Sequence, residues 1–331
     1  MDSVIEQLAV PISAESPCGA DLEDTQLLAA FDGYRLFGQM AQPPDDTDWR
    51  EIRDKAIEGL AQSKDLRLLA HLGAAQLRMG GLAGFCDVLQ AAGRWFAQYP
   101  EEIYPRVDED AILRRNALSC LADRMAIVET VRRQPFISNA QLGAFGLREF
   151  DVATGKAPAS PGGAAPPSEA HLSAALAAME AAVLESLNAS LVGSVSALRQ
   201  IDSAMRDKHG AQGTPDFEPL LAPLVEIQRI LQGEVQTRAN NAAPPEDAGD
   251  TEADAPGAGK VITVGSIRSR DDAIRALDAV ATYFRKNEPS SPVPIFVERA
   301  KKLVAKDFLE VLAELAPDGL KQAKHFEGSK D

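Results

Sequence analysis

Two stretches of biased composition divide the 331-residue chain and limit what it can fold into. Residues 153–168 consist almost wholly of Ala, Pro, Gly and Ser, and residues 241–259 add five acidic side chains and no basic one. Such segments cannot bury enough apolar surface to offset the loss of chain entropy, so both are predicted to be flexible linkers. We therefore expect three structured segments, 1–152, 169–240 and 260–331.

The composition of these segments favours helices. Aromatic residues make up only 5% of a chain that is 45% hydrophobic, and alanine and leucine are plentiful. Helices favour Ala and Leu, whereas strands favour aromatic and β-branched residues. The predicted fold is mainly α, with an N-terminal helical domain, a middle helical hairpin or bundle and a small helical C-terminal domain.

Apolar residues at helical spacing place the expected elements. In the first segment they predict helices over 46–62, 65–79, 82–98 and 110–133, followed by a short loop or strand over 136–150. Asp46 or Thr47 is the expected N-cap of the first. The middle segment should form helices within 169–190 and 216–239. Its alanine-rich part fits an oligomerisation element and a spacer equally well.

The last segment starts with a β-like run at 261–264 and then becomes helical. We expect one helix from Asp271 and Asp272, a second capped by Ser291 with Pro292 at its first position, and a third from Asp307. Residues 260–331 carry 13 basic and 11 acidic side chains, whereas the whole chain has a net charge of −15. This contrast indicates a separate docking role.

Charge and cysteine content narrow the function classes. A strongly acidic chain argues against nucleic acid or an anionic membrane as the main partner. The three cysteines are far apart and form no CxxC motif, so reduced thiols in a reducing compartment are expected. We see no signal peptide and no membrane-spanning apolar run. A cytoplasmic protein without direct membrane insertion is predicted.

Motifs for catalysis, metals and cofactors are missing from the sequence. The four histidines lie in unrelated contexts, and neither HExxH nor GxSxG occurs. Asp45, Asp46 and Asp48 could form a metal site or paired carboxylates, but a helix N-terminus enriched in acids explains them better. The pair Arg132-Arg133 fits the C-terminal end of a helix in the same way. No catalytic residue, metal ligand or cofactor is predicted, and the chain is not expected to be an enzyme.

The most distinctive cluster lies in the last segment. A helix–turn–helix explains the residues Pro289, Ser290 and Ser291 as a turn. It does not explain why five arginines gather around two glutamates, Glu288 and Glu298; these arginines are Arg268, Arg270, Arg275, Arg285 and Arg299. An internal salt-bridge lattice and a contact surface for an acidic partner are both possible explanations, and the two are compatible.

At both ends the sequence resembles the TssA family of type VI secretion machines. The C-terminal resemblance rests on Arg268-x-Arg270, Tyr283-Phe284-Arg285, Asn287-Glu288-Pro289-Ser290-Ser291-Pro292, Arg299-Ala300 and Leu315-Ala-Pro317. The N-terminal segment is similar to the ImpA-type domain of that family. The matching residues are Pro11, Pro17, Gly19, Asp21, Leu22, Asp48-Trp49, Lys64-Asp65, Tyr99-Pro100, Tyr104-Pro105 and Arg115-Asn116.

The resemblance implies a non-enzymatic, cytoplasmic assembly component of the type VI secretion system. Its implied partners are baseplate subunits, tail tube and sheath proteins, and membrane-complex proteins, and a homo-oligomer is expected. The short C-terminal domain fits a role at the baseplate better than ring formation. The C-terminal motif residues would contact a partner. A generic helical adaptor and a helical enzyme without a recognisable motif are the alternatives.

Overall fold

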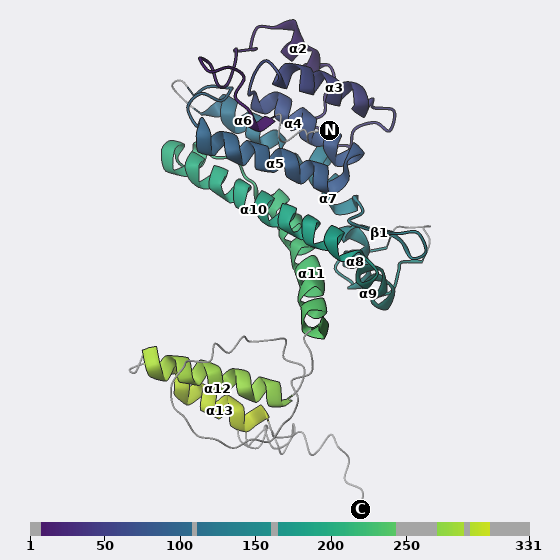
Figure 1. The fold of residues 1–331 in the computed structure, drawn as a ribbon, viewed down its shortest axis with the longest axis vertical. Coiled ribbons are helices and arrows are strands. Elements are labelled where there is room, and N and C mark those ends of the chain that lie inside the picture. Colours follow the sequence, from purple (N-terminus) through teal and green to yellow (C-terminus); the bar gives the residue numbers. More distant parts are fainter. Residues whose placement is uncertain (1–7, 108–110, 160–164, 243–269, 288–291, 305–331) are drawn as a thin grey trace, which may run out of the picture. The chain divides into compact units, whose positions relative to one another are not determined.

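The chain is mainly α-helical, as predicted, and forms two compact units, 1–246 and 247–331 (Figure 1). The computed structural model describes residues 8–107, 111–159, 165–242, 270–287 and 292–304. The β-like run at 261–264 and the third C-terminal helix predicted from Asp307 lie outside these residues.

The first unit begins with helices that share one core. Helix α2 (Gln26–Asp32) packs on α3 (Trp49–Leu60), which packs on α4 (Leu66–Met79), and α4 packs on α5 (Gly81–Gln98). The predicted N-cap of α3 was wrong, because the side chain of Asp48 accepts from the amide of Glu51. The turn between α4 and α5 needs Gly81 at φ 68°, a left-handed conformation that glycine adopts without steric cost.

The helix predicted over 110–133 is interrupted. It consists of α6 (Ile112–Cys120), a π-helical turn η1 (Arg124–Val128) and α7 (Glu129–Arg133). Asp123 sits at the break with extended backbone, and its Oδ1 accepts from the amides of Met125 and Ala126 at 3.0 and 2.8 Å. An aspartate that caps a new helical turn competes with continuation of the previous helix, which the apolar spacing alone did not reveal.

A small hairpin follows α7. Strands β1 (Ile137–Asn139) and β2 (Gly143–Phe145) pair antiparallel, with Ser138 opposite Ala144. The predicted loop or strand over 136–150 is therefore a hairpin, but its last residues already belong to helix α8 (Leu147–Ala153).

The middle segment packs against the first segment. It comprises α9 (Glu169–Ala177), α10 (Ala181–His209), η2 (Ala211–Gly213) and α11 (Glu218–Ala242), and α10 runs alongside α5 (Figure 1). The helices approach so closely that a Cβ on Gly93 would lie 2.6 Å from the Cβ of Ala197. The hydroxyl of Ser194 donates to the carbonyl of Cys86 at 3.1 Å. Residues 169–240 thus share the core of the N-terminal segment.

Helix α10 is long and apolar. Among the described residues it is the helix whose length and apolar composition would suffice to cross a bilayer, and 33% of its most apolar window is buried in the unit. Its side chains Leu191, Leu198 and Ile201 belong to the common core. Core helices meet the same criteria of length and composition.

The second unit contains a helical hairpin formed by α12 (Arg270–Asn287) and α13 (Val293–Val304). Ala281 and Val297 are its buried apolar residues among those described. Pro292 directly precedes α13, one residue before the position predicted for it. The proposed cap, Ser291, lies outside the described residues.

Candidate docking sites

Two of the N-terminal motif residues, Lys64 and Asp65, lie in the short segment between α3 and α4. Lys64 is 1% exposed, and its Nζ donates to the carbonyls of Leu8 and Val10 at 2.9 and 2.8 Å. The same Nζ lies 5.1 Å from the centroid of the Trp95 ring. Burial lowers the pKa of Lys64. The ammonium group fastens the N-terminal segment onto the core, which is a structural role.

The neighbouring motif residues continue this arrangement. Gly19 has φ 74°, and a Cβ there would lie 2.0 Å from the carbonyl oxygen of Gln62, so no other residue fits. Asp65 is fully buried, caps α4 by accepting from the amide of Arg67, and forms an ion pair with the Arg67 guanidinium at 2.7 Å. Backbone bonds join Lys64 to Cys18 on one side and to Tyr104 on the other.

The remaining N-terminal motif residues also shape the chain locally. The carbonyl of Pro17 accepts from the amide of Ile12, in a turn that begins next to the exposed Pro11. Asp21 accepts from the amide of Glu23, and Leu22 is buried. Trp49 differs, because its half-buried ring lies 4.0 Å from the guanidinium carbon of Arg78 at the edge of a surface pocket.

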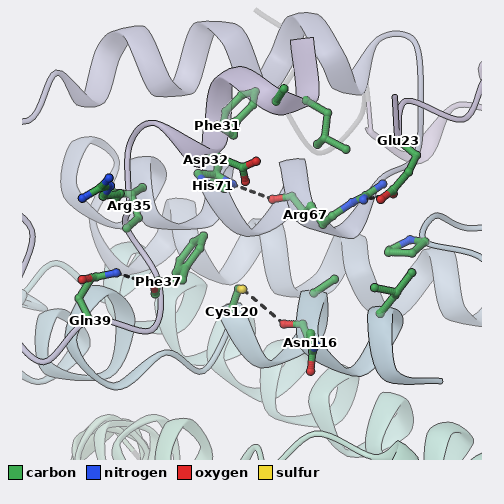
Figure 2. Close-up of a pocket in the computed structure, with 16 residues that line it drawn as sticks. Glu23, Phe31, Asp32, Arg35, Phe37, Gln39, Arg67, His71, Asn116 and Cys120 are labelled. Atoms are coloured by element: carbon green, nitrogen blue, oxygen red, sulfur yellow. Dashed lines mark hydrogen bonds and ion pairs between the residues drawn. The ribbon is translucent and has the colours of Figure 1, made fainter. Parts of the chain in front are cut away.

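A larger open pocket of about 550 Å³ lies between α2, α4, α6 and the loop 33–39 (Figure 2). Its walls are mixed: aromatic and aliphatic side chains line much of it, and charged groups line the rest. The residues are Glu23, Leu28, Ala29, Phe31, Asp32, Arg35, Leu36, Phe37, Gln39, Arg67, His71, Pro105, Leu113, Asn116, Ala117 and Cys120. None of these residues was predicted from the sequence to line a pocket.

His71 lies at the aromatic side of this pocket. Its ring lies between Phe31 and Phe37, with centroids 4.7 and 4.8 Å away. Nδ1 is 2.9 Å from the carbonyl oxygen of Arg67 (Figure 2), so Nδ1 must carry the proton. Desolvation lowers the pKa of His71. The imidazole is therefore neutral near pH 7, and one of its nitrogens is committed to the backbone.

The loop that forms one wall of the pocket is held by Asp123. Gly38, at φ 72°, donates its amide to Asp123 Oδ2 at 2.8 Å, while Oδ1 caps η1. Arg35 lies in the same loop at φ 47°, a conformation uncommon outside glycine and asparagine. A single carboxylate thus couples the pocket wall to the break after α6. No motif marks Asp123, and only its place after an apolar helical stripe could have drawn attention to it.

The charges and thiol of the pocket do not form a catalytic constellation. Arg67 forms ion pairs with both Asp65 and Glu23. Burial raises the pKa of the Cys120 thiol to about 11, and its Sγ donates to the carbonyl of Asn116. In the part of the chain that the structure describes, no group of three or more His, Cys, Asp or Glu side chains could hold a metal ion.

The C-terminal motif residues are only partly described. Arg268, Glu288, Pro289, Ser290 and Ser291 lie outside the described residues, and Arg270 and Arg275 are described only in their backbone, on α12. The guanidinium of Arg285 forms an ion pair with Glu298 at 2.9 Å, and Lys301 pairs with both Glu298 and Asp278. The Arg285–Glu298 and Lys301–Asp278 pairs join α12 to α13, the Lys301–Glu298 pair lies within α13, and together they account for part of the charge cluster.

The hairpin also presents apolar and basic side chains to solvent. Tyr283 is 57%, Ile295 74% and Phe296 67% exposed, whereas the ring of Phe284 is half-buried. Arg299 and Lys302 are exposed and have no ion pair among the described residues. Large exposed apolar side chains gathered on one small element mark interaction surfaces.

Comparisons with known proteins agree with this architecture. Residues 9–123 match the family model described as ImpA, N-terminal, type VI secretion system. The chain is 28% identical over 338 residues to the type VI secretion system component TssA1 of Pseudomonas aeruginosa, covering 97% of each protein.

A solved structure shares the fold of most of this chain. It is the N-terminal domain, including the conserved ImpA_N region, of the TssA component of the type VI secretion system from Burkholderia cenocepacia. The match has a TM-score of 0.55 at 22% identity, and covers 72% of this chain and 96% of that one. This structure shows the shared fold, and the two sequence matches support the assignment of the chain to the TssA family of type VI secretion system components.

Proposed function

We propose that this protein is a non-enzymatic scaffold in the cytoplasm that holds parts of the type VI secretion machine together during tail assembly. The N-terminal unit docks one partner, and the α12–α13 hairpin docks baseplate subunits. Tail tube, sheath and membrane-complex proteins are the further partners. The similarity to TssA components supports a role in the type VI secretion system. The division of the chain into two compact units supports separate docking tasks for each unit.

The observation that carries the proposal is the composition of the hairpin surface. Tyr283, Ile295 and Phe296 expose apolar area, and Arg299 and Lys302 supply positive charge beside it. The chain as a whole has a net charge of −15, whereas residues 260–331 carry 13 basic and 11 acidic side chains, so the segment with these exposed apolar residues is slightly basic. Apolar anchors with a charged rim are typical of protein–protein interfaces.

The non-enzymatic part of the proposal is supported by the large pocket. Its histidine has Nδ1 committed to the backbone, and its thiol has a raised pKa. Nucleophilic catalysis by cysteine needs a lowered thiol pKa and an adjacent base. Turnover of a small molecule by the purified protein would contradict this part of the proposal.

Co-purification of the full chain with baseplate subunits tests the docking role. The variant Ile295→Glu with Phe296→Glu should reduce capture at least about tenfold, because burying two carboxylates at an apolar contact is costly. Met40→Glu is the matched control, since Met40 is 95% exposed on the other unit. Equal capture by all three proteins would refute docking through the hairpin.

The oligomeric state is part of the same proposal. We expect a homo-oligomer, because a second copy could cover exposed apolar side chains of the hairpin in the absence of the baseplate. Mass measurement of the purified full chain at several concentrations tests this. A mass equal to one chain at every concentration would contradict it.

A further inference from the structure

A small pocket of about 230 Å³ lies where the loop before α3 meets the end of α4 and helix α7. Its lining combines two arginines, a tryptophan and two prolines. The lining residues are Gln42, Pro43, Pro44, Asp45, Trp49, Arg78, Thr130, Arg133 and Gln134. We call it the Arg78 pocket. Asp45, Trp49 and Arg133 come from sequence features that the scaffold role does not use.

Arg78 is held in place by backbone and hydroxyl acceptors. Its Nη1 donates to the carbonyls of Ala74 and Ala126 at 3.1 and 2.9 Å, and its Nη2 donates to Thr130 Oγ1 at 2.9 Å. A guanidinium has five N–H donors, so Nε–H and one Nη2–H have no partner within the described residues. The ring of Trp49 lies 4.0 Å from the guanidinium carbon.

No carboxylate in the described chain pairs with Arg78. Desolvation lowers the pKa of Arg78 to about 10, so the group stays charged near pH 7, and no carboxylate among the described residues neutralises it. Arg133 is a second cation at the rim, where it is 52% exposed and forms a long ion pair of 3.8 Å with Glu129. Asp45 is the carboxylate among the lining residues. Asp45 and Glu129 match the two cations in number, but neither carboxylate forms an ion pair with Arg78 among the described residues.

A purely structural role explains Arg78 incompletely. Arg114 shows what such a role looks like, because its Nε, Nη1 and Nη2 donate to the carbonyls of Pro105, Pro100 and Ile103 and its side chain is buried. Arg78 also makes three bonds among the described residues, but none of them comes from Nε, and its side chain is half-buried at a pocket that opens to solvent. It also fastens the π-helical turn η1, and π-helical turns are frequent at functional sites.

We propose that the Arg78 pocket binds an aspartate or glutamate carboxylate from a segment of a partner protein. The two open donors lie on neighbouring nitrogens and can be shared by the two carboxylate oxygens, and Arg133 contributes charge at the rim. Pro43 and Pro44 offer rigid contact for the methylene groups of the acidic side chain. The inference rests on the proposed scaffold role only in assigning the carboxylate to a protein.

Nuclear magnetic resonance on the full chain tests the site without any partner. The probe is N-acetyl-glutamic acid amide, and its neutral isostere N-acetyl-glutamine amide is the control. At constant ionic strength the acidic probe should give saturable shifts of the Trp49 indole N–H and the Arg78 Nε–H, and the neutral probe should not. Equal shifts from both probes, or no shift, would overturn the proposal. This titration contains no baseplate subunit, so its outcome does not depend on whether the hairpin captures the baseplate.

Two charge variants act in opposite directions and keep the test independent of folding. Asp45→Asn removes a competing carboxylate and should tighten binding of the acidic probe roughly two- to fivefold, the range of exposed charge pairs. Arg133→Gln should weaken it by a similar factor. Arg199→Gln, on the exposed face of α10, is the matched control and should change nothing. Unchanged or weaker binding by Asp45→Asn would contradict a carboxylate site.

Discussion

The two units use positive charge in opposite ways. In the N-terminal unit Lys64 and Arg114 are 1% and 2% exposed, and both bind backbone carbonyls. In the α12–α13 hairpin Arg285, Arg299 and Lys302 are exposed, and Arg285 pairs with a carboxylate across the hairpin. Of these, Lys64, Arg285 and Arg299 are family motif residues, and Lys64 holds the fold of its unit whereas Arg285 and Arg299 are exposed. A basic residue in such a motif does not by itself indicate a binding surface.

The sharpest way to break this comparison is to remove one lysine from each unit. Lys64→Met should lower the free energy of unfolding by about 3 kcal/mol, because it removes two charge-assisted hydrogen bonds from buried carbonyls. Lys302→Met, on the exposed side of α13, should leave stability unchanged. Denaturant unfolding followed by tryptophan fluorescence reports the first unit, because Trp49 and Trp95 both lie there, and far-ultraviolet circular dichroism follows the hairpin as well. Similar losses in the two variants would show that the contrast is false.

A second test asks whether α10 belongs to the core of the N-terminal unit. Gly93→Ala should destabilise the protein by about 2 kcal/mol, since its Cβ would meet Ala197 at 2.6 Å and force α5 and α10 apart. Gly233→Ala, in α11 with open space around its Cβ, should stabilise by up to about 1 kcal/mol. Thermal unfolding gives both signs. A neutral Gly93→Ala would mean that the α5–α10 contact is loose.

A third test concerns the wall of the large pocket. Asp123→Ala removes the cap of η1 and the acceptor for the Gly38 amide, and should cost about 1–2 kcal/mol. Hydrogen exchange at Gly38 should accelerate strongly, because its amide loses its partner. Asp123→Asn keeps one acceptor oxygen, so its stability and its exchange rate at Gly38 should lie between those of the wild-type protein and the alanine variant. Unchanged exchange at Gly38 in the alanine variant would contradict the coupling.

Helical spacing predicted the long elements of this fold well. The stripes over 65–79 and 82–98 became α4 and α5, since apolar periodicity and the Gly80-Gly81 stop agree with the packing. The prediction of one continuous helix over 110–133 was wrong, because Asp123 caps a new helical turn and apolar periodicity does not reveal such a cap. The packing of α10 on α5 could not be predicted from the sequence, because that contact joins small residues about a hundred positions apart.

The candidate sites were predictable to different degrees. The motif residues of the N-terminal segment were found, but their structural role depends on backbone carbonyls, which the sequence does not distinguish. The large pocket was missed because its lining comes from three helices and a loop. Arg78 carried no signal either, since an arginine near the end of a helix is ordinarily a surface residue.

The smallest expected effect concerns the pH dependence of stability. Desolvation depresses the pKa of His71 below its ordinary value of 6.5, so the unfolded chain binds a proton at a higher pH than the folded chain does. The contribution of this neutral imidazole is therefore fully present above about pH 6.5 and is lost as the pH falls towards the lower, folded-state pKa. One proton limits the slope to about 1.4 kcal/mol per pH unit.

His71→Phe isolates this effect, because phenylalanine keeps the aromatic contacts with Phe31 and Phe37 but does not titrate. The free energy of unfolding of both proteins should be measured between about pH 7.5 and 5.5, above the range where most carboxylates titrate. The wild-type protein should lose more stability than the variant over this interval. The hydrogen bond to the Arg67 carbonyl and the charges of Asp32 and Asp65 act on the pKa of His71 in the opposite direction to burial, so a parallel pair of curves would mean that together they cancel the desolvation.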